Sequence, residues 1–303
     1  MNHWTFRQAT VVLVVSVTVT FTLSFGSYFL YRHRKMKRLS EPRYFVTTLI
    51  QTGPEKEALK TPYLAELLGL SADRPVNLYA VDEAKAAAAL LASPLIVRAS
   101  VERRSPAALY VDYEVRKPVA WVADYKNVAL DAQGFLFPIA PFFSPQEMPE
   151  IYLGLPPFGA TIDSFGRQGG QWKVPLQNKH LELAFEVLRL LEGSSWKEGL
   201  TVKRIDVSNA FAPTLGRREI VLFTEEELSF KTGVVFSFPK IIRLAPHDYA
   251  SQLQNFFSLR KTMLDDYRKQ LMAQTQGVKF APRIVDLRIG QLAFVENTKD
   301  GGL

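Results

Sequence analysis

The chain has 303 residues, no cysteine and a formal net charge of +7. A chain of this length is expected to hold about two domains of ~100–200 residues. Without cysteine it offers neither a disulfide framework nor a thiolate metal site. Residues 1–40 carry six of the 37 Lys and Arg residues and none of the 30 acids, which leaves 31 against 30, a net of +1, over residues 41–303. Because this remainder lacks the basic surface that phosphate-backbone binding requires, no nucleic-acid partner is expected.

The first predicted element is a membrane-spanning helix. Residues 8–31 contain no charged side chain, and as a helix at ~1.5 Å per residue they would span roughly 36 Å, enough for a hydrocarbon core of about 30 Å. Trp4 and Tyr31 suit the two membrane interfaces. A cleaved signal peptide is the alternative, but the run is long for one and no A-x-A cleavage site follows. We therefore predict a short tail over 1–7, a retained anchor that contacts the lipid bilayer over 8–31, and a basic linker over 32–43.

Residues 44–117 show the pattern of a small domain whose elements follow the order β-α-α-β-β. A strand is expected over residues 44–53, and leucines at helical spacing follow over residues 64–70. Asp82 is a candidate N-cap for a helix over residues 84–91.

The last two strands of this domain have the clearest pattern, because apolar and polar residues alternate on both sides of the turn at Ser105-Pro106. Such alternation is typical of half-buried strands. The apolar face is expected to hold Ala99, Val101, Leu109, Val111, Tyr113 and Val115. The polar face is expected to hold Arg98, Ser100, Glu102, Arg104, Tyr110, Asp112, Glu114 and Arg116.

A second domain is expected over residues 118–296, followed by a flexible tail over 297–303. Short β-like runs separated by Pro and Gly lie at 119–123, 127–131, 135–139, 201–207, 218–224, 228–236 and 284–295. Two helical patterns interrupt them. Residues 179–192 place Leu181, Ala184, Phe185, Leu188 and Leu191 on one face, and residues 247–272 do so with Leu253, Phe256, Phe257, Met263, Leu264 and Leu271. The predicted fold is an α+β domain with a mostly antiparallel sheet and two helices.

No residue pattern points to catalysis, a cofactor or a metal ion. His3, His33, His180 and His247 are scattered and form no ligand pair, and neither a G-x-S-x-G elbow nor a Walker loop is present. The glycine-rich run at 166–170 lacks a phosphate-binding lysine, so a loop is the better interpretation. The acids at 225–227 and 265–266 are interpreted as solvated surface. We expect a protein that is not an enzyme.

Several motifs, taken in order, resemble the FtsQ/DivIB family of bacterial cell-division proteins. Around the two alternating strands they are Pro94, Ala99-x-Val101-x-Arg103, Pro106, Leu109 and Arg116-x-Pro118-Val119-Ala120. Elsewhere they are Asn77-Leu78-Tyr79-x-Val81-Asp82, Leu130-Asp131-x-x-Gly134-x-x-Phe137-Pro138 and Val285-Asp286-Leu287-Arg288. The resemblance implies a POTRA module over residues 44–117 between the anchor and the β domain. It also implies a non-enzymatic bitopic scaffold of the division machinery in the inner membrane, enriched at the division site, with the C-terminal domain in the periplasm.

The resemblance further implies that the last strand, 284–295, receives the FtsB-like member of an FtsB/FtsL-like pair. A partner strand would complete the open edge by β-augmentation, and the POTRA module would contact other membrane partners. We expect Arg288, Ile289, Gln291 and Phe294 to make the contact, with Arg288 facing an acidic partner group and Ile289 and Phe294 as apolar anchors. Ordinary strand packing is the alternative for each of them. Charge reversal at Arg288 is then expected to weaken partner binding and leave the fold intact.

The orientation of the anchor has two opposed indications. Five Lys and Arg residues lie between Arg32 and Arg38, against Arg7 at the other end, and the positive-inside rule would keep the larger cluster in the cytoplasm. The resemblance implies the opposite topology, which we follow because long domains translocate largely regardless of flanking charge. A cytoplasm-facing membrane-anchored signalling protein remains one alternative. A POTRA-containing chaperone or transport module is another, although the chain shows one module and no barrel.

Overall fold

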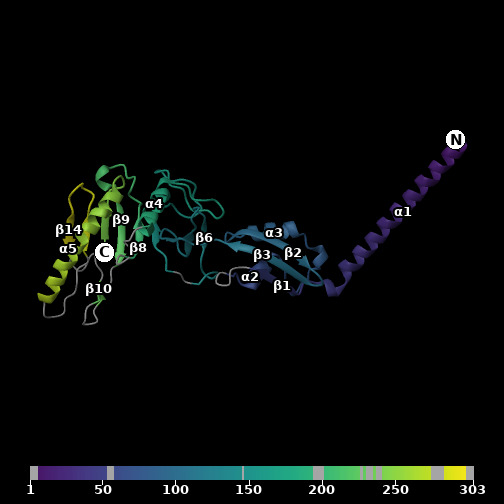
Figure 1. The fold of residues 1–303 in the computed structure, drawn as a ribbon, viewed down its shortest axis with the longest axis horizontal. Coiled ribbons are helices and arrows are strands. Elements are labelled where there is room, and N and C mark those ends of the chain that lie inside the picture. Colours follow the sequence, from purple (N-terminus) through teal and green to yellow (C-terminus); the bar gives the residue numbers. More distant parts are fainter. Residues whose placement is uncertain are drawn as a thin grey trace. The chain divides into compact units, whose positions relative to one another are not determined.

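The computed structural model describes residues 6–52, 58–144, 147–193, 201–225, 228–229, 235–236, 241–273 and 283–297. The chain divides into two compact units, an N-terminal unit that ends at Val115 and a C-terminal unit that begins at Arg116 (Figure 1). Each unit is described by itself. The division lies two residues before the expected boundary at 117.

The N-terminal unit begins with one long helix, α1 (Phe6–Ser40), which is long and apolar enough over Thr10–Ser40 to cross a membrane. Several of its hydroxyl side chains donate to carbonyls one turn earlier, as Thr18 does to Val14 O at 2.8 Å, so these hydroxyls are satisfied within the helix itself. The expected linker over 32–43 is wrong in its first part, because the helix continues through the basic residues to Ser40. Lys and Arg are good helix formers.

The rest of the N-terminal unit is a three-stranded sheet with two helices. Its elements are η1 (Pro42–Tyr44), β1 (Thr48–Thr52), α2 (Thr61–Leu67), η2 (Leu78–Ala80), α3 (Glu83–Leu91), β2 (Ile96–Arg104) and β3 (Ala108–Val115). The strand order is β1-β3-β2, with β1 parallel and β2 antiparallel to the central β3. The strand expected over 44–53 begins only at Thr48, because residues 42–44 form a 3₁₀ turn. Gly53, at its expected end, lies outside the described residues.

Two local predictions for this unit are confirmed. The Asp82 carboxylate accepts hydrogen bonds from the N–H groups of Ala84 (3.1 Å) and Lys85 (3.2 Å), so it caps α3. The alternation in β2 and β3 places one face in the core, where Val101, Leu109, Val111, Tyr113 and Val115 are buried.

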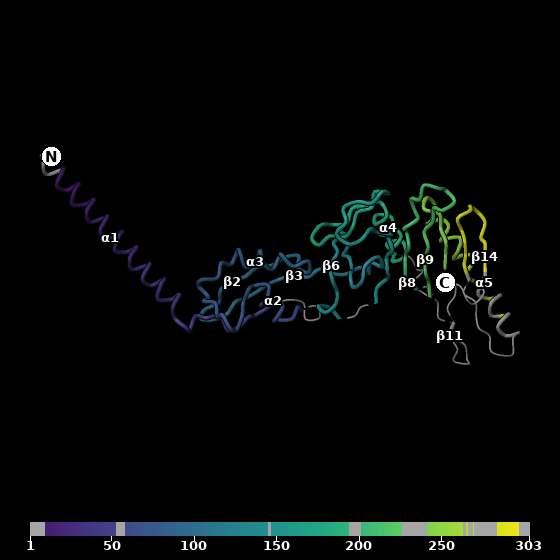
Figure 2. The backbone as a smooth tube through the Cα atoms, turned by 180° about the vertical axis from the view of Figure 1, so that it is seen from behind, coloured from purple at the N-terminus to yellow at the C-terminus, as the bar shows by residue number. Residues whose placement is uncertain are grey.

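The C-terminal unit is built on a mixed nine-stranded sheet. Its first elements are β4 (Ala120–Val122), β5 (Val128–Leu130), β6 (Leu136–Pro138), β7 (Glu150–Tyr152), α4 (Lys179–Gly193), β8 (Thr201–Asp206), η4 (Leu215–Arg217) and β9 (Ile220–Glu225). They are followed by β10 (Leu228–Ser229), β11 (Val235–Phe236), β12 (Ile241–Leu244), α5 (Tyr249–Ala273), β13 (Arg283–Asp286) and β14 (Phe294–Asn297). The strand order is β14-β13-β12-β9-β8-β7-β4-β5-β6, while β10 and β11 form a separate pair. Figure 2 shows the backbone from behind, where the chain of this unit passes from β6 along β8 and β9 to β14.

Antiparallel pairs predominate in this sheet, as expected, but β4–β7, β7–β8 and β12–β13 are parallel. Strands β7 and β12 were not predicted. The run expected at 228–236 divides into β10 and β11, and the residues between them lie outside the described part. The tail expected over 297–303 is described only at Asn297, which ends β14.

The two helices bury the faces that their spacing predicts. Leu181, Ala184 and Leu188 of α4 lie in the core, as do Leu253 and Phe256 of α5. The side chains of Met263, Leu264 and Leu271 lie outside the described part.

A buried ion pair lies at the start of the C-terminal unit. Arg116 Nη1 lies 2.6 Å from Asp131 Oδ2, and the two side chains are only 11% and 6% exposed. The other Asp131 carboxylate oxygen accepts from the N–H groups of Gln133 (3.0 Å) and Phe135 (2.9 Å). Gly134, between them, has φ +85, a conformation that suits glycine. Asp131 therefore closes the β5–β6 turn and neutralises a buried cation.

Candidate functional site

Strand β14 forms one edge of the nine-stranded sheet. It pairs antiparallel with β13 in the register Val285↔Val295 and Asp286↔Phe294, and among the described residues no further strand pairs with its other side. An edge strand of this kind leaves a row of backbone N–H and C=O groups free for pairing.

Apolar side chains at this edge are exposed. Phe294 and Val295 are 53% and 46% exposed, and because neighbours on a strand point to opposite faces, the described residues cover neither face of β14. Ile289 and Leu292, in the loop before β14, are 56% and 54% exposed. Although β14 is only four residues long and its second half, Glu296-Asn297, is polar, exposed apolar side chains gathered at one edge of a sheet are typical of interaction sites. This edge therefore has the character of an interaction surface.

The single strand expected over 284–295 is wrong, because the segment forms a hairpin. Strand β13 ends at Asp286 and β14 begins at Phe294. Between them the Leu292 N–H donates to Ile289 O at 3.2 Å, which closes a turn with Gln291 at φ 62 in its third position. Gly290 is the sequence signal for this break, since an isolated glycine in a strand pattern often marks a bulge or turn.

A hollow of about 470 Å³ lies beside the hairpin. It is lined by Leu215, Gly216, Arg218, Ala245, Pro246, His247, Asp286, Arg288, Ile289 and Phe294. Leu215 is 76% exposed, so the hollow has an apolar rim on the side of η4 as well as on the side of the hairpin. Its size suits one or two side chains of a partner.

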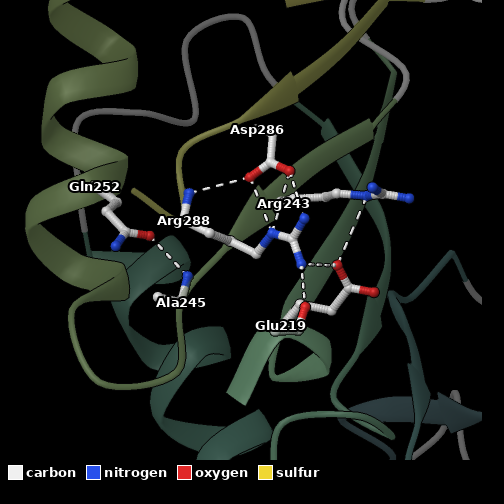
Figure 3. Close-up of polar contacts among 7 residues, drawn as sticks. Glu219, Arg243, Ala245, Gln252, Asp286 and Arg288 are labelled. Carbon is white, nitrogen blue, oxygen red and sulfur yellow. Dashed lines mark hydrogen bonds and ion pairs between the residues drawn. The ribbon is translucent and has the colours of Figure 1, made fainter. Parts of the chain in front are cut away.

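Arg288 lines this hollow, and polar contacts within its own chain hold its side chain (Figure 3). Its guanidinium donates to the Asp286 carboxylate through Nε (3.0 Å to Oδ1) and Nη2 (2.7 Å to Oδ2). Arg288 Nη1 lies 3.2 Å from Glu219 Oε2 and donates to the Gly216 carbonyl at 3.2 Å. Arg243 Nε lies 3.7 Å from the same Glu219 oxygen. Arg288 therefore fixes the hairpin to the loop before β9.

The electrostatics of this group follow from its geometry. Burial raises the pKa of Asp286, but the hydrogen bonds and charge of Arg288 outweigh burial and hold that pKa below its ordinary value. Hydrogen bonding to Asp286 raises the pKa of Arg288, against the opposing effect of burial. The cluster is therefore a charge-balanced structural group at pH 7, with Arg243 and Arg288 facing Asp286 and Glu219.

The structure brings three of the four sequence-predicted contact residues together. Ile289 and Phe294 are exposed and line the hollow beside Arg288. Gln291 lies in the turn and does not line it. Arg288 already has two acidic neighbours within its own chain, so a role in facing an acidic partner would compete with these contacts.

Sequence reasoning missed further apolar residues of this surface. Leu292 and Val295 belong to the predicted segment but were not singled out, and Leu215 comes from a loop about seventy residues earlier. Leu292 and Val295 follow from the apolar character of the segment once the hairpin is known. For Leu215 the sequence holds no signal, because one leucine in a loop has no periodicity.

In the described part of the chain no group of three or more His, Asp or Glu side chains is placed to hold a metal ion. Glu226 and Glu227, two of the three adjacent acids, lie outside that part. No protein-family model matches the chain, and no curated protein matches it. The open edge of β14, the exposed apolar residues and the adjacent hollow are therefore the observations on which a function is proposed.

Proposed function

We propose that this protein is a non-enzymatic, single-pass membrane scaffold of the bacterial division machinery, similar to FtsQ, that recruits a partner strand to the open edge of β14. The observation that carries the proposal is this edge, which is unpaired within the described residues, exposes one apolar side chain on each face (Phe294 and Val295) and lies beside a hollow of about 470 Å³. A partner strand would gain backbone hydrogen bonds along β14, and its alternate side chains would cover Phe294 and enter the hollow.

The anchor supplies the second part of the proposed mechanism. An α1 helix in the bilayer confines the protein to two dimensions, which raises its effective concentration for partners in the same membrane. The partner proposed from the family resemblance is the FtsB-like member of an FtsB/FtsL-like pair. The β-α-α-β-β order of the N-terminal unit supports a module of POTRA type, and this module is proposed to contact other membrane partners.

Replacement of Val295 by lysine tests the edge directly. Lysine on an edge strand is a device by which proteins prevent strand pairing. Val295 lies opposite the buried Val285 in the register but is 46% exposed, so a lysine there can extend its charged end into solvent. We expect copurification of the full chain with the FtsB/FtsL-like pair of its host to fall about tenfold or more, since central apolar contacts contribute 1–2 kcal/mol or above.

The chain offers a matched control. Val97 lies on β2, an edge strand of the N-terminal sheet, and is also 46% exposed. Val97→Lys adds the same charge to an equally exposed residue of an edge strand, at a register shift between Ile96 and Arg98, and is expected to retain partner binding. Retained binding by a folded Val295→Lys protein, or equal loss with both variants, would refute recruitment through β14.

Topology separates the scaffold from its alternatives. We expect protease added outside spheroplasts to digest an epitope tag at the C-terminus, with a cytoplasmic marker left intact. A protected tag would favour a cytoplasm-facing signalling protein, which the cluster at Arg32–Arg38 suits. A digested tag combined with capture of unfolded outer-membrane polypeptides and no division defect would favour a chaperone or transport module.

A further inference from the structure

A second hollow, of about 410 Å³, lies at the C-terminal end of α1. It is lined by Tyr31, Arg34, Lys35, Arg38, Tyr79 and Arg103. The first four recur at i, i+3, i+4 and i+7 and therefore share one face of α1. Tyr79 comes from η2 and Arg103 from β2. All six residues belong to the N-terminal unit.

Hydrogen bonds fix the end of α1 to η2. The Asn77 side-chain amide, in a residue only 6% exposed, donates to the carbonyls of Arg38 (2.9 Å) and Leu39 (3.0 Å). These are among the last carbonyls of the helix, which have no partner within it. The Asn77 side-chain oxygen accepts from the Tyr79 N–H at 2.9 Å, and the Arg38 guanidinium lies 5.4 Å from the Tyr79 ring centroid. These contacts hold the end of α1 against η2, so the fold itself keeps the residues that line the hollow together.

The hollow has an excess of positive charge. Arg103 is paired with Glu83 at 3.0 Å, whereas no ion pair formed among the described residues involves Arg34, Lys35 or Arg38. Like charges at i, i+3 and i, i+4 repel one another, so an anion placed between them would relieve this repulsion. Arginine forks and a lysine ammonium together are the groups that proteins use for phosphate.

The depth of the hollow matches the headgroup region of a bilayer. Tyr31 ends the uncharged run, and Arg34 and Lys35 follow about 5–6 Å further along the helix axis at ~1.5 Å per residue. The polar region on each side of a bilayer is roughly 5–7 Å thick. Side chains on a helix lean toward its N-terminus, which on α1 is the direction of the membrane, so the more distant Arg38 also reaches back toward the headgroups.

We propose that this hollow binds the phosphate-bearing headgroup of an anionic phospholipid in the leaflet next to residues 41–303. The inference rests on the proposed membrane insertion of α1. Free phosphate has the same chemistry, but the hollow continues directly from the membrane-crossing run, so a lipid headgroup is the occupant. The site gives the basic cluster at 32–38 a role that is separate from setting topology.

The test uses the full chain reconstituted in phosphatidylcholine vesicles that contain phosphatidylglycerol. Spin-labelled forms of the two lipids report the relative contact of each with the protein. We expect preference for phosphatidylglycerol, which Arg34→Gln/Lys35→Gln lowers by up to roughly thirtyfold, because each of the two cations removed contributes ~1 kcal/mol near an anionic surface. Arg32→Gln/Lys37→Gln is the matched control, because it removes the same charge from the same helix outside the lining.

The outcomes are distinct. If Arg32→Gln/Lys37→Gln retains the preference for phosphatidylglycerol, the result supports a specific site in the hollow. If both double variants lose the preference equally, the attraction is a diffuse one to the basic helix, and the proposed site is overturned. Preference abolished by added inorganic phosphate at constant ionic strength would assign the hollow to a soluble anion and overturn the lipid occupant. If alkaline carbonate extracts the chain from the vesicles, α1 is not a membrane anchor, and the lipid site is overturned with it. If the chain resists extraction but shows no preference between the two lipids, only the lipid site is overturned.

Discussion

Arg288 offers the sharpest test of how the candidate surface is held together. In Arg288→Ala the Asp286 carboxylate loses three charge-assisted hydrogen bonds and Glu219 loses one ion pair. Breaking a buried pair costs about 3–5 kcal/mol. Because the Arg288 side chain is 26% exposed, water recovers part of this cost, and we expect a loss of about 2–3 kcal/mol. Arg288→Glu brings a third carboxylate to the group and is expected to cost more, so charge reversal would not leave the hairpin intact.

The pH dependence of this loss has a definite sign. Arg288 holds the pKa of Asp286 below its ordinary value in the folded chain, whereas the unfolded value is about 3.9. The stabilisation is therefore fully present above about pH 4 and is lost as the pH falls through the folded pKa. The stability difference between the wild type and Arg288→Ala is expected to shrink below about pH 4, where Asp286 takes up a proton in the variant.

Urea unfolding of the detergent-solubilised chain measures the loss through the fluorescence of Trp121 and Trp172, both in the C-terminal unit. Amide exchange over residues 283–297 shows whether the hairpin opens. Arg218→Ala is the matched control, because Arg218 lines the same hollow but, among the described residues, forms no ion pair and donates from Nε to the Ala212 carbonyl at 2.8 Å. If Arg288→Ala and Arg218→Ala are equally stable, Arg288 does not hold the hairpin in place, and its side chain is available to contact a partner.

Three further changes test individual elements. Asp82→Ala removes the cap of α3 and is expected to lower the stability of the N-terminal unit by about 1 kcal/mol, measured by thermal unfolding. Asp73→Ala, in an exposed turn, is the control and is expected to leave the stability nearly unchanged. Asp131→Asn removes the charge of the carboxylate that lies 2.6 Å from Arg116 and is expected to cost about 3 kcal/mol. An unchanged midpoint of urea unfolding would contradict this. Gly134 has φ +85, and Gly134→Ala would place a Cβ 3.0 Å from the Leu176 carbonyl oxygen. We expect this change to lower the stability by about 1–3 kcal/mol in urea unfolding. Gly216→Ala is the control, because a Cβ at Gly216 would meet open space.

The sequence predicted most where the signal is local. Strict alternation placed Val101, Val111 and Val115 on the buried face before any contact was known. The Asp82 cap followed from one residue type ahead of a helical run. The helix over 179–192 ends within one residue of the observed Gly193, since glycine stops helices.

The missed features depend on contacts between distant segments. β7 pairs in parallel with β4 and β8, and β12 pairs in parallel with β13; parallel pairs are joined by long connections, so no hairpin turn in the sequence marks them. The pairing of Arg288 with Glu219 joins positions 69 residues apart, and only the fold brings them together. The hairpin at the candidate site was missed because the β-like character of 284–295 outweighed the single glycine at 290.

The strand order of the large sheet has a consequence for how the candidate surface forms. From β6 at one edge to β14 at the other, the order follows the chain except for the reversal of β4, β5 and β6. After β7, each new strand of this sheet therefore finds its neighbour already synthesised, and the sheet can lengthen at one side as the chain emerges. Among the described strands β14 is the last to join, so its open edge forms only once the eight other described strands of this sheet are in place. A partner strand that binds there would occupy the next place in the same series, and only molecules with the rest of this sheet formed would be able to recruit it.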